Sequence, residues 1–233
     1  MSGITASPEE IARFDALASR WWDPNGPMRP LHRMNPARVK WIIDRAPRER
    51  PTALLDIGCG AGLAAEALAR HGFDVLGLDA AGEAIEAARA HAAAQDLPLT
   101  YRTGVPEDLL ADKRQFPIVT ALEVIEHVPD PVSFLAILRD LLLPGGQLFL
   151  STLNRTPRSY LAAKVGAEYL LRWLPIGTHN WRSFITPAEL AGMLRSLGLR
   201  VTDVAGLAPD PLSGNWRVVR DTSVNYLLTS TNK

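Results

Sequence analysis

Short apolar runs alternate with longer stretches of helical periodicity between residues 52 and 151. The apolar runs predict strands at 53–57, 74–78, 99–102, 118–122 and 147–151, and the intervening stretches predict helices at 62–70, 82–94 and 132–142. Parallel strands need a crossover connection, and helices at this spacing supply one. With two further strands near the end of the chain, we expect an α/β fold: a doubly wound, mostly parallel seven-stranded sheet.

The N-terminal flank carries helix signals. Residues 7–10 read Ser-Pro-Glu-Glu, which predicts a capping box and a helix running towards Arg20. After a stretch rich in proline and glycine, a second helix is expected at 36–46. These elements should form a helical cap of residues 1–50.

The C-terminal flank repeats the capping signature at residues 186–189, which should open a helix that ends at Gly198. Strands are expected at 201–207 and 224–231. Because no helix separates them, the final strand should run antiparallel to the others. The whole chain, 1–233, is expected to be one domain, comprising a cap (1–50), a core (51–152), a lid-like insert (153–185) and a C-terminal helix with strands (186–233).

Composition excludes several classes of protein. The 25 basic and 25 acidic residues cancel, so no overall positive field would recruit nucleic acid. Cys59 is the only cysteine, which excludes an internal disulfide and a zinc site made of several thiolates. The first twenty residues lack the apolar stretch of a signal peptide, and the sequence has no run of 18 apolar residues. We therefore expect a cytoplasmic protein.

Three glycines, Gly58, Gly60 and Gly62, follow the first expected strand with the spacing GxGxG. Glycine at a strand-to-helix turn leaves the backbone free of Cβ atoms, so a ligand can lie directly against it. The dinucleotide-binding pattern GxGxxG would need a third glycine at position 63, which is Leu63. Asp56, just before the loop, would repel phosphates and suits a ligand that carries an ammonium or sulfonium group.

Asp79 lies at the end of the second expected strand. A carboxylate at that position can accept hydrogen bonds from both hydroxyls of a ribose. Taken singly, each feature has a structural explanation without a ligand: the glycines would form a tight turn, and the two aspartates would cap helices. Their joint placement at successive strand ends favours a ligand site.

Three motifs together resemble those of class I methyltransferases. They are residues 55–62 (LDIGCGAG), 77–79 (GLD) and 143–146 (LPGG). The resemblance covers about residues 50–152 and implies a core that binds S-adenosylmethionine (SAM). It implies that the glycine loop holds the methionine part of SAM, that Asp79 holds the ribose, and that Leu122 packs on the adenine. Pro117 stands where the family has an acid, which puts the start of the fourth strand in question, but not the donor site.

The flanks resemble a narrower family, the ubiquinone-biosynthesis O-methyltransferases. The matching segments are 18–24 (ASRWWDP), 30–36 (PLHRMNP), 151–155 (STLNR), 165–169 (VGAEY) and 224–226 (VNY). This resemblance implies methylation of phenolic hydroxyls on polyprenyl catechol and demethylubiquinol intermediates, with other enzymes of ubiquinone biosynthesis as partners. It also implies that Arg38 contacts the donor, whose carboxylate a guanidinium can bind through two hydrogen bonds.

Glu123, Glu126 and His127 follow the fourth strand, at the edge of the sheet where ligands bind, and are the expected catalytic residues. A phenol with a pKa of about 10 is mostly protonated at neutral pH, so methylation needs a base or a metal. Either His127 takes the proton directly, or the three side chains hold one Mg²⁺ that a catecholate chelates. Mg²⁺ prefers oxygen ligands, which makes the imidazole unusual. The stretch is also explained as the start of the next helix, without any catalytic role.

Residues 155–182 carry five basic side chains and one acidic one, an excess of four positive charges in a chain whose net charge is zero. Leu161, Val165, Tyr169 and Trp173 recur every four residues along an expected helix. Apolar, aromatic and basic side chains together are typical of a helix at a membrane interface. We expect this insert either to dock on an anionic membrane, at its inner face, or to pack as an ordinary lid.

Other functions of the same sequence stay open at this point. A C-methyltransferase or a methyltransferase of small soluble phenols would share the fold, and a protein that binds SAM without turnover would share the donor site. An NAD-dependent oxidoreductase is disfavoured by Leu63 and Asp56.

Overall fold

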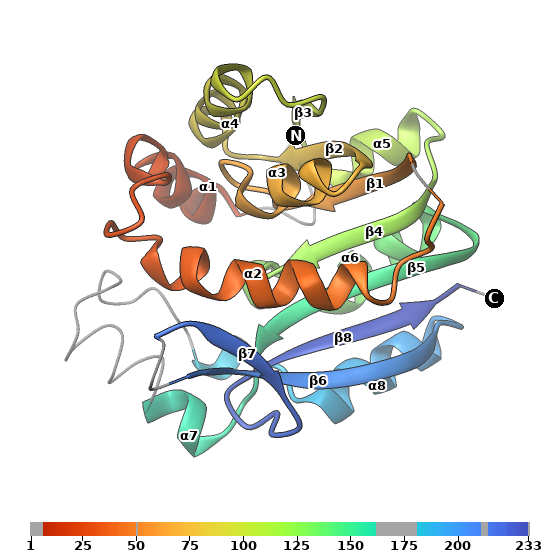
Figure 1. Cartoon of the computed structure of the whole chain (residues 1–233). Coiled ribbons are helices and arrows are strands. Elements are labelled where there is room, and N and C mark those ends of the chain that lie inside the picture. The colour runs from red at the N-terminus through yellow and green to blue at the C-terminus, as the bar shows by residue number, and fades with distance from the viewer. Residues whose placement is uncertain (1–6, 50, 162–180, 211–213, 233) are drawn as a thin grey trace.

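The computed structural model describes residues 7–49, 51–161, 181–210 and 214–232, whose strands form a single sheet (Figure 1). Its order is β3-β2-β1-β4-β5-β8-β6-β7. The strands are β1 (Thr52–Ile57), β2 (Phe73–Asp79), β3 (Thr100–Thr103), β4 (Phe116–Leu122), β5 (Leu142–Leu153), β6 (Arg200–Pro209), β7 (Trp216–Val219) and β8 (Asn225–Thr231). The chain order reverses between β1 and β4, and ligands of α/β sheets bind beyond the carboxyl ends of strands at such a reversal.

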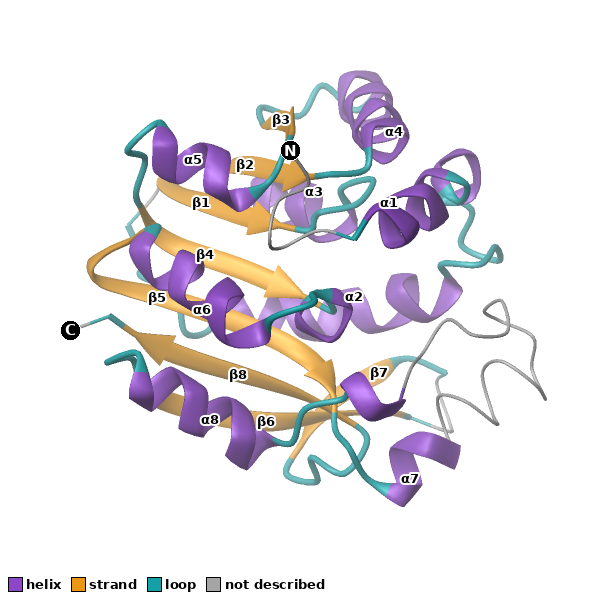
Figure 2. Cartoon of the chain, turned by 180° about the vertical axis from the view of Figure 1, so that it is seen from behind, coloured by secondary structure: helices purple, strands orange, loops and turns teal. Residues whose placement is uncertain are grey.

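Helices cover both faces of the sheet (Figures 1 and 2). One face carries α2 (Arg29–Ile43), α3 (Leu63–Arg70) and α4 (Gly82–Ala94), and the other carries α5 (Pro106–Ala111), α6 (Pro131–Asp140) and α8 (Pro187–Ser196). The remaining described helices are α1 (Pro8–Asp15), α7 (Pro157–Ser159) and the short 3-10 turns η1 (Ala18–Arg20), η2 (Ile125–His127) and η4 (Trp181–Ser183). In Figure 2, α1 lies at the end of the sheet towards which β1, β4 and β5 point.

Alternate side chains of the central strands enter two different cores. On β1, Leu54 packs in the cluster that contains Trp41 of α2, whereas Leu55 packs in the cluster that contains Leu138 of α6. Both leucines are fully buried. A strand that is covered on both faces is apolar at successive positions, which is why β1 appears in the sequence as a continuous run.

The predicted doubly wound α/β architecture is confirmed, and β8 runs antiparallel to both β5 and β6, as expected for the last strand. Two details differ. The sheet of the described residues has eight strands and not seven, because the short strand β7 pairs antiparallel with β6. β4 begins at Phe116, before Pro117, and its pairing with β5 shifts register between Phe116 and Ile118, which accommodates a residue without an N–H group.

The second helix begins at Arg29 and not at residue 36. Pro30 lies in its first turn, where the missing N–H has no helical partner in any case. Pro36 lies inside the helix, so the carbonyl of His32 lacks its usual donor. Pro30 therefore lies at the true start of the helix, although an irregular stretch was expected there. Pro36, at which the helix was expected to begin, lies in its interior. The first helix also ends earlier than expected, at Asp15 instead of near Arg20.

The two expected capping boxes have different outcomes. At α8, the Thr186 hydroxyl accepts a hydrogen bond from the Glu189 N–H at 3.2 Å, and the Glu189 carboxylate accepts one from the Thr186 N–H at 2.9 Å. At α1, Ser7 is the N-cap residue but its side chain makes no capping hydrogen bond. The Glu10 carboxylate, which would complete that box, is engaged elsewhere.

The expected lid-like insert falls largely on residues 162–180, which lie outside the described residues. At its described start, Tyr160 and Leu161 are exposed to solvent. Within the described ranges, none of the helices has the length and apolar character needed to cross a bilayer.

Candidate active site

The glycine loop that follows β1 has three residues in the left-handed backbone conformation, at alternate positions: Gly58 (φ 67°), Gly60 (φ 53°) and Gly62 (φ 91°). Residues with a Cβ rarely adopt these angles. A Cβ on Gly60 would also lie 2.2 Å from the Trp21 ring. The loop therefore requires glycine both for its own conformation and because the N-terminal cap lies directly on it.

Asp79, at the end of β2, holds the glycine loop in place. One carboxylate oxygen accepts a hydrogen bond from the Gly60 N–H at 2.7 Å, and the other accepts one from the Ala81 N–H at 2.8 Å. Burial raises the pKa of Asp79, and these backbone hydrogen bonds oppose that shift. Each carboxylate oxygen can accept a second hydrogen bond, so the side chain keeps the capacity to bind the two hydroxyls of a ribose.

Asp56 and Arg38 are buried and are not among the residues that line the cavity described below. Asp56 accepts a hydrogen bond from the Thr120 hydroxyl at 2.6 Å, and burial raises the pKa of Asp56 to about 6. Arg38 donates to the Asn35 side chain at 3.3 Å, and burial lowers its pKa. The second oxygen of Asp56 and the Nε of Arg38 have no hydrogen-bond partner.

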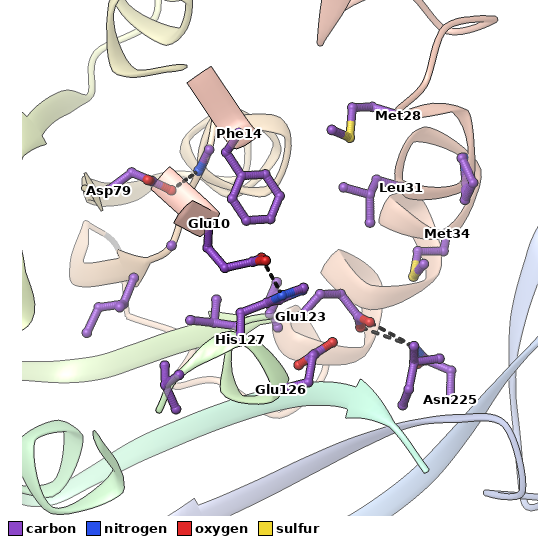
Figure 3. A pocket seen from close by; sticks show the side chains of 18 of the residues that line it. Glu10, Phe14, Met28, Leu31, Met34, Asp79, Glu123, Glu126, His127 and Asn225 are labelled. Atoms are coloured by element: carbon purple, nitrogen blue, oxygen red, sulfur yellow. Dashed lines mark hydrogen bonds and ion pairs between the residues drawn. The ribbon is translucent and has the colours of Figure 1, made fainter. Parts of the chain in front are cut away.

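A cavity of about 520 Å³ lies at the carboxyl ends of β1, β2 and β4. It extends from Gly58, Gly60 and Asp79 past Glu123 and His127. Figure 3 shows the side chains that line it, with Met28, Leu31 and Met34 of the α2 region on one side and Glu10 and Phe14 of α1 on another. The far end is formed by β6, β7, the segment before β8 and the first residue of β8, through Leu207, Ala208, Pro209, Trp216, Ser223 and Asn225. The walls are predominantly apolar.

Glu123 follows β4 in the left-handed conformation, with φ 59°. Its carboxylate accepts hydrogen bonds from the Ser151 hydroxyl at 2.6 Å and from the Asn225 amide at 3.1 Å. Arg38 lies 4.0 Å away and forms an ion pair with it. Side chains from three other segments, β5, β8 and α2, therefore converge on one carboxylate at the cavity wall.

Glu126 and His127 lie in the short turn η2. Glu126 is buried and accepts a hydrogen bond from the Thr152 hydroxyl at 2.8 Å; burial and the neighbouring Glu123 charge raise its pKa. His127 Nδ1 lies 2.8 Å from a carboxylate oxygen of Glu10 (Figure 3). Burial opposes the charged form of His127, but pairing with Glu10 and the nearby carboxylates outweigh it, so the pKa of His127 is raised.

The magnesium site expected from Glu123, Glu126 and His127 stays a prediction. In this arrangement each of the three side chains contacts a different partner: Glu123 contacts Ser151 and Asn225, Glu126 contacts Thr152, and His127 contacts Glu10. Among the residues that the structure describes, no three His, Cys, Asp or Glu side chains are grouped as metal ligands. The three residues do line one cavity, as expected, and Leu122 lines it with them.

Two groups at the site were missed by the sequence reasoning. Glu10 and Phe14 come from α1, which was expected only as part of a helical cap, and Asn225 comes from the start of β8. The ring of Phe14 meets the His127 ring edge-on, with centroids 5.6 Å apart. No signal in the sequence pointed to Glu10, because the Ser-Pro-Glu-Glu pattern assigned this glutamate to a local capping box that the structure does not form.

The comparisons with known proteins agree with this geometry. A family model described as a methyltransferase domain matches residues 31–204. A protein of Cereibacter sphaeroides named ubiquinone biosynthesis O-methyltransferase is 45% identical, over 97% of this chain and 96% of its own length. A protein of Methylobacterium nodulans with the same name is 46% identical, over 98% and 96%.

The fold is also similar to solved methyltransferase structures. Magnesium protoporphyrin IX methyltransferase from Synechocystis, crystallised with bound S-adenosylhomocysteine, superposes with a TM-score of 0.70 at 17% identity, covering 96% of this chain and 100% of that one. A SAM-dependent methyltransferase from Thermotoga maritima gives 0.66 at 18% identity, covering 97% and 99%. The whole-length relatives, the family model and the donor-site geometry agree, and the chain belongs to the SAM-dependent ubiquinone biosynthesis O-methyltransferases.

Proposed function

We propose that the chain methylates a phenolic hydroxyl on a polyprenyl catechol or hydroquinol, with SAM as the donor. One observation carries the proposal. A single cavity runs from the glycine loop and Asp79, past an imidazole, to an apolar far end. Both substrates of a transfer reaction must meet in line, and a continuous cavity allows the phenol oxygen to lie behind the methyl group.

The donor-site residues have separable roles in this proposal. SAM supplies an electrophilic methyl group on a sulfonium. Asp79 binds the ribose hydroxyls, Leu122 packs on the adenine, and the loop of Gly58, Gly60 and Gly62 admits the methionine part. Arg38 and Asp56 do not line the cavity in this structure, but each keeps one buried polar atom without a partner, Arg38 Nε and the second oxygen of Asp56, and these atoms are proposed to bind the carboxylate and the ammonium of that part. These atoms support the assignment because unpartnered buried polar groups are costly.

His127 is the proposed base. It accepts the phenolic proton as the oxygen attacks the methyl group, the carbon–sulfur bond breaks with its electrons left on sulfur, and S-adenosylhomocysteine departs. The charges of Glu10 and Glu126 favour the protonated imidazole that results. The raised pKa of His127 supports this role, because a stronger base accepts the proton more readily.

The polyprenyl tail is proposed to follow the apolar far end of the cavity. Met28, Leu31 and Met34 are spaced three residues apart and line the cavity together. They lie on the same face of a helix, because side chains three apart are neighbours. Methionine adapts to irregular apolar shapes, which suits a long flexible tail. Leu207 and Trp216 of β6 and β7 line the same cavity.

Residues 155–182 are proposed to attach the protein to the inner face of an anionic membrane, where such tails reside. The exposed Tyr160 and Leu161 support an apolar contact at its described start. The electrostatic part is smaller than the charge count suggests, because Arg155 pairs with Glu189 and Arg158 pairs with Asp221. Sedimentation with anionic and neutral liposomes tests this. No sedimentation with either lipid contradicts attachment, and equal sedimentation with both discards the charge contribution.

The central experiment is transfer of a labelled methyl group from SAM to a short-chain prenyl catechol, with and without a chelator. We expect an O-methylated product in both conditions. If the activity is lost with chelator and restored by Mg²⁺, the reaction uses a metal-assisted step and not direct base catalysis by His127. A C-methylated product, or SAM binding without any transfer, would contradict the proposed function itself.

A further inference from the structure

Helix α1 forms part of the cavity wall and packs only at the margin of a core cluster. Glu10, Ile11 and Phe14 line the cavity, and Ile11 and Phe14 pack as partly buried side chains against the cluster that contains Trp21, yet none of the residues of α1 is fully buried. A helix held this lightly can separate from the rest of the fold at low cost, because local stability follows buried contacts.

The specific contacts of α1 are few. At its end, Asp15 accepts a hydrogen bond from the Glu83 N–H at 2.9 Å, at the start of α4. In its middle, Glu10 extends towards the cavity and meets His127, while Arg13, one turn further on, pairs with the other Glu10 oxygen at 3.1 Å. The pairing lowers the pKa of Glu10, chiefly through its contact with His127. Glu10 is therefore charged and fixed from both sides.

The contact between Glu10 and His127 determines what the imidazole can do. The ring nitrogen that faces Glu10 is Nδ1, at ion-pair distance but without the geometry of a hydrogen bond. The negative charge of the carboxylate favours the form of the imidazole that carries its proton on Nδ1, which leaves the lone pair of Nε2 to accept a proton. Phe14, from the same helix, limits the rotation of the ring through its edge-on contact.

We propose that Glu10 is a positioning residue for His127, supplied by α1 so that the base is oriented only when this helix covers the cavity. The inference rests on the proposed function, since it assigns a partner to the proposed base. The charged groups that face His127 are Glu10 and Arg13 from α1 and Glu126 from its own turn. Of these, Glu10 alone touches the imidazole and comes from outside the sheet.

The test compares Glu10→Gln with Glu9→Gln. Glu9 is the neighbouring acid on the same helix, is exposed and does not line the cavity, so it controls for the loss of one negative charge. Methyl transfer to a short-chain prenyl catechol is measured from pH 5 to 9, together with SAM affinity. Glu10→Gln should lower kcat by about tenfold or more and leave SAM affinity unchanged. The acidic limb of its pH profile should move to lower pH, because His127 loses the carboxylate that raises its pKa.

A second arm combines Glu10→Gln with His127→Ala. If Glu10 acts through the imidazole, its substitution has no further effect once the imidazole is absent. An equal loss in both backgrounds, or Glu10→Gln behaving like Glu9→Gln, overturns the inference and leaves the proposed function intact. If wild-type protein transfers no methyl group at all, the proposed function fails first, so the two failures are distinguishable.

Discussion

The two ends of the cavity are built in different ways. The proposed donor end is built mainly from one strand–loop–helix unit and the next strand end, so Gly58, Gly60 and Asp79 come from within about twenty residues, and only Arg38 and Leu122 are added from elsewhere. The proposed acceptor end draws Glu10, Glu123, Asn225 and the wall of α2 from widely separated segments. Local sequence dictates most of the first, whereas the second exists only after the whole chain has folded. Substitutions at the donor end should therefore change SAM binding alone, and those at the acceptor end should change turnover or acceptor binding.

The largest effect is expected for His127→Ala. Loss of the base should lower kcat by about 100-fold or more, while SAM affinity stays the same. Stopped-time methyl-transfer assays and calorimetric titration with S-adenosylhomocysteine measure the two quantities. His71→Ala, at the exposed end of α3, is the matched control. A loss of SAM affinity as large as the loss of turnover would contradict the expectation that SAM binding and turnover depend on different ends of the cavity.

Asp79→Ala tests the donor end. Removing a charged acceptor of two ribose hydrogen bonds should weaken S-adenosylhomocysteine binding at least about tenfold, since each bond to a charged group contributes about 1.5–3 kcal/mol. Asp74→Ala, which removes an exposed acid from the same strand, should bind normally. Because Asp79 also anchors the Gly60 N–H, thermal melting should be followed in parallel. Unchanged affinity in a folded variant would exclude Asp79 from the donor site.

Leu31→Glu probes the proposed tail wall. A charge in an apolar channel should raise KM for a prenylated catechol by about tenfold, because an apolar contact is replaced by a group that must be desolvated. The KM for a catechol without a tail should change little. Val132→Glu, an exposed site at the start of α6, is the control. Equal increases for both substrates would place the tail elsewhere.

The smallest effect concerns the pH dependence of stability. Because the pKa of His127 is raised in the folded protein, its contribution to the free energy of unfolding is complete below the ordinary pKa of 6.5 and is lost as pH rises through the folded-state pKa. Because the pKa of Glu10 is lowered, its contribution to the free energy of unfolding is complete above the ordinary pKa of 4.5 and is lost as pH falls through the folded-state pKa. The difference in Tm between wild type and His127→Gln should therefore be largest between about pH 4.5 and 6.5. A difference that is constant with pH would show that the pair does not titrate.

The part of the fold that could be predicted follows from local periodicity. The strands around Asp56 and Asp79 and the helices after them appear where the apolar pattern indicated, because burial on two faces leaves a strong local signal. The start of α2 could not be predicted in the same way, since Pro30 and Pro36 look alike in sequence and only one of them lies at a helix end. Strand β7 carries mostly exposed side chains and left no apolar pattern.

In the candidate site, too, the features that follow from local sequence could be predicted and those that depend on tertiary contacts could not. Glu123, Glu126 and His127 were placed together correctly because they follow one strand. Their partners could not be inferred, since Ser151, Asn225 and Glu10 reach them through tertiary contacts. The metal hypothesis followed from residue type and from the position of all three residues after one strand; it stays a prediction, and in this structure the three side chains contact different neighbours. Residue type suggested a site, but only the arrangement of the chain distinguishes a ligand cluster from three separate hydrogen-bonded groups.

The left-handed backbone of Glu123 has a consequence for protein engineering. A residue with a Cβ costs on the order of 1 kcal/mol or more in that conformation, whereas glycine adopts it freely. Glu123→Gly should thus relax the backbone while removing the carboxylate that Ser151, Asn225 and Arg38 contact. The substitution would also leave the buried Arg38 guanidinium without its ion-pair partner, which costs on the order of a few kcal/mol. The loss of these contacts outweighs the relief of backbone strain, so glycine at this position should lower the free energy of unfolding. A screen for heat resistance would therefore retain the strained glutamate, although its φ angle alone suggests glycine.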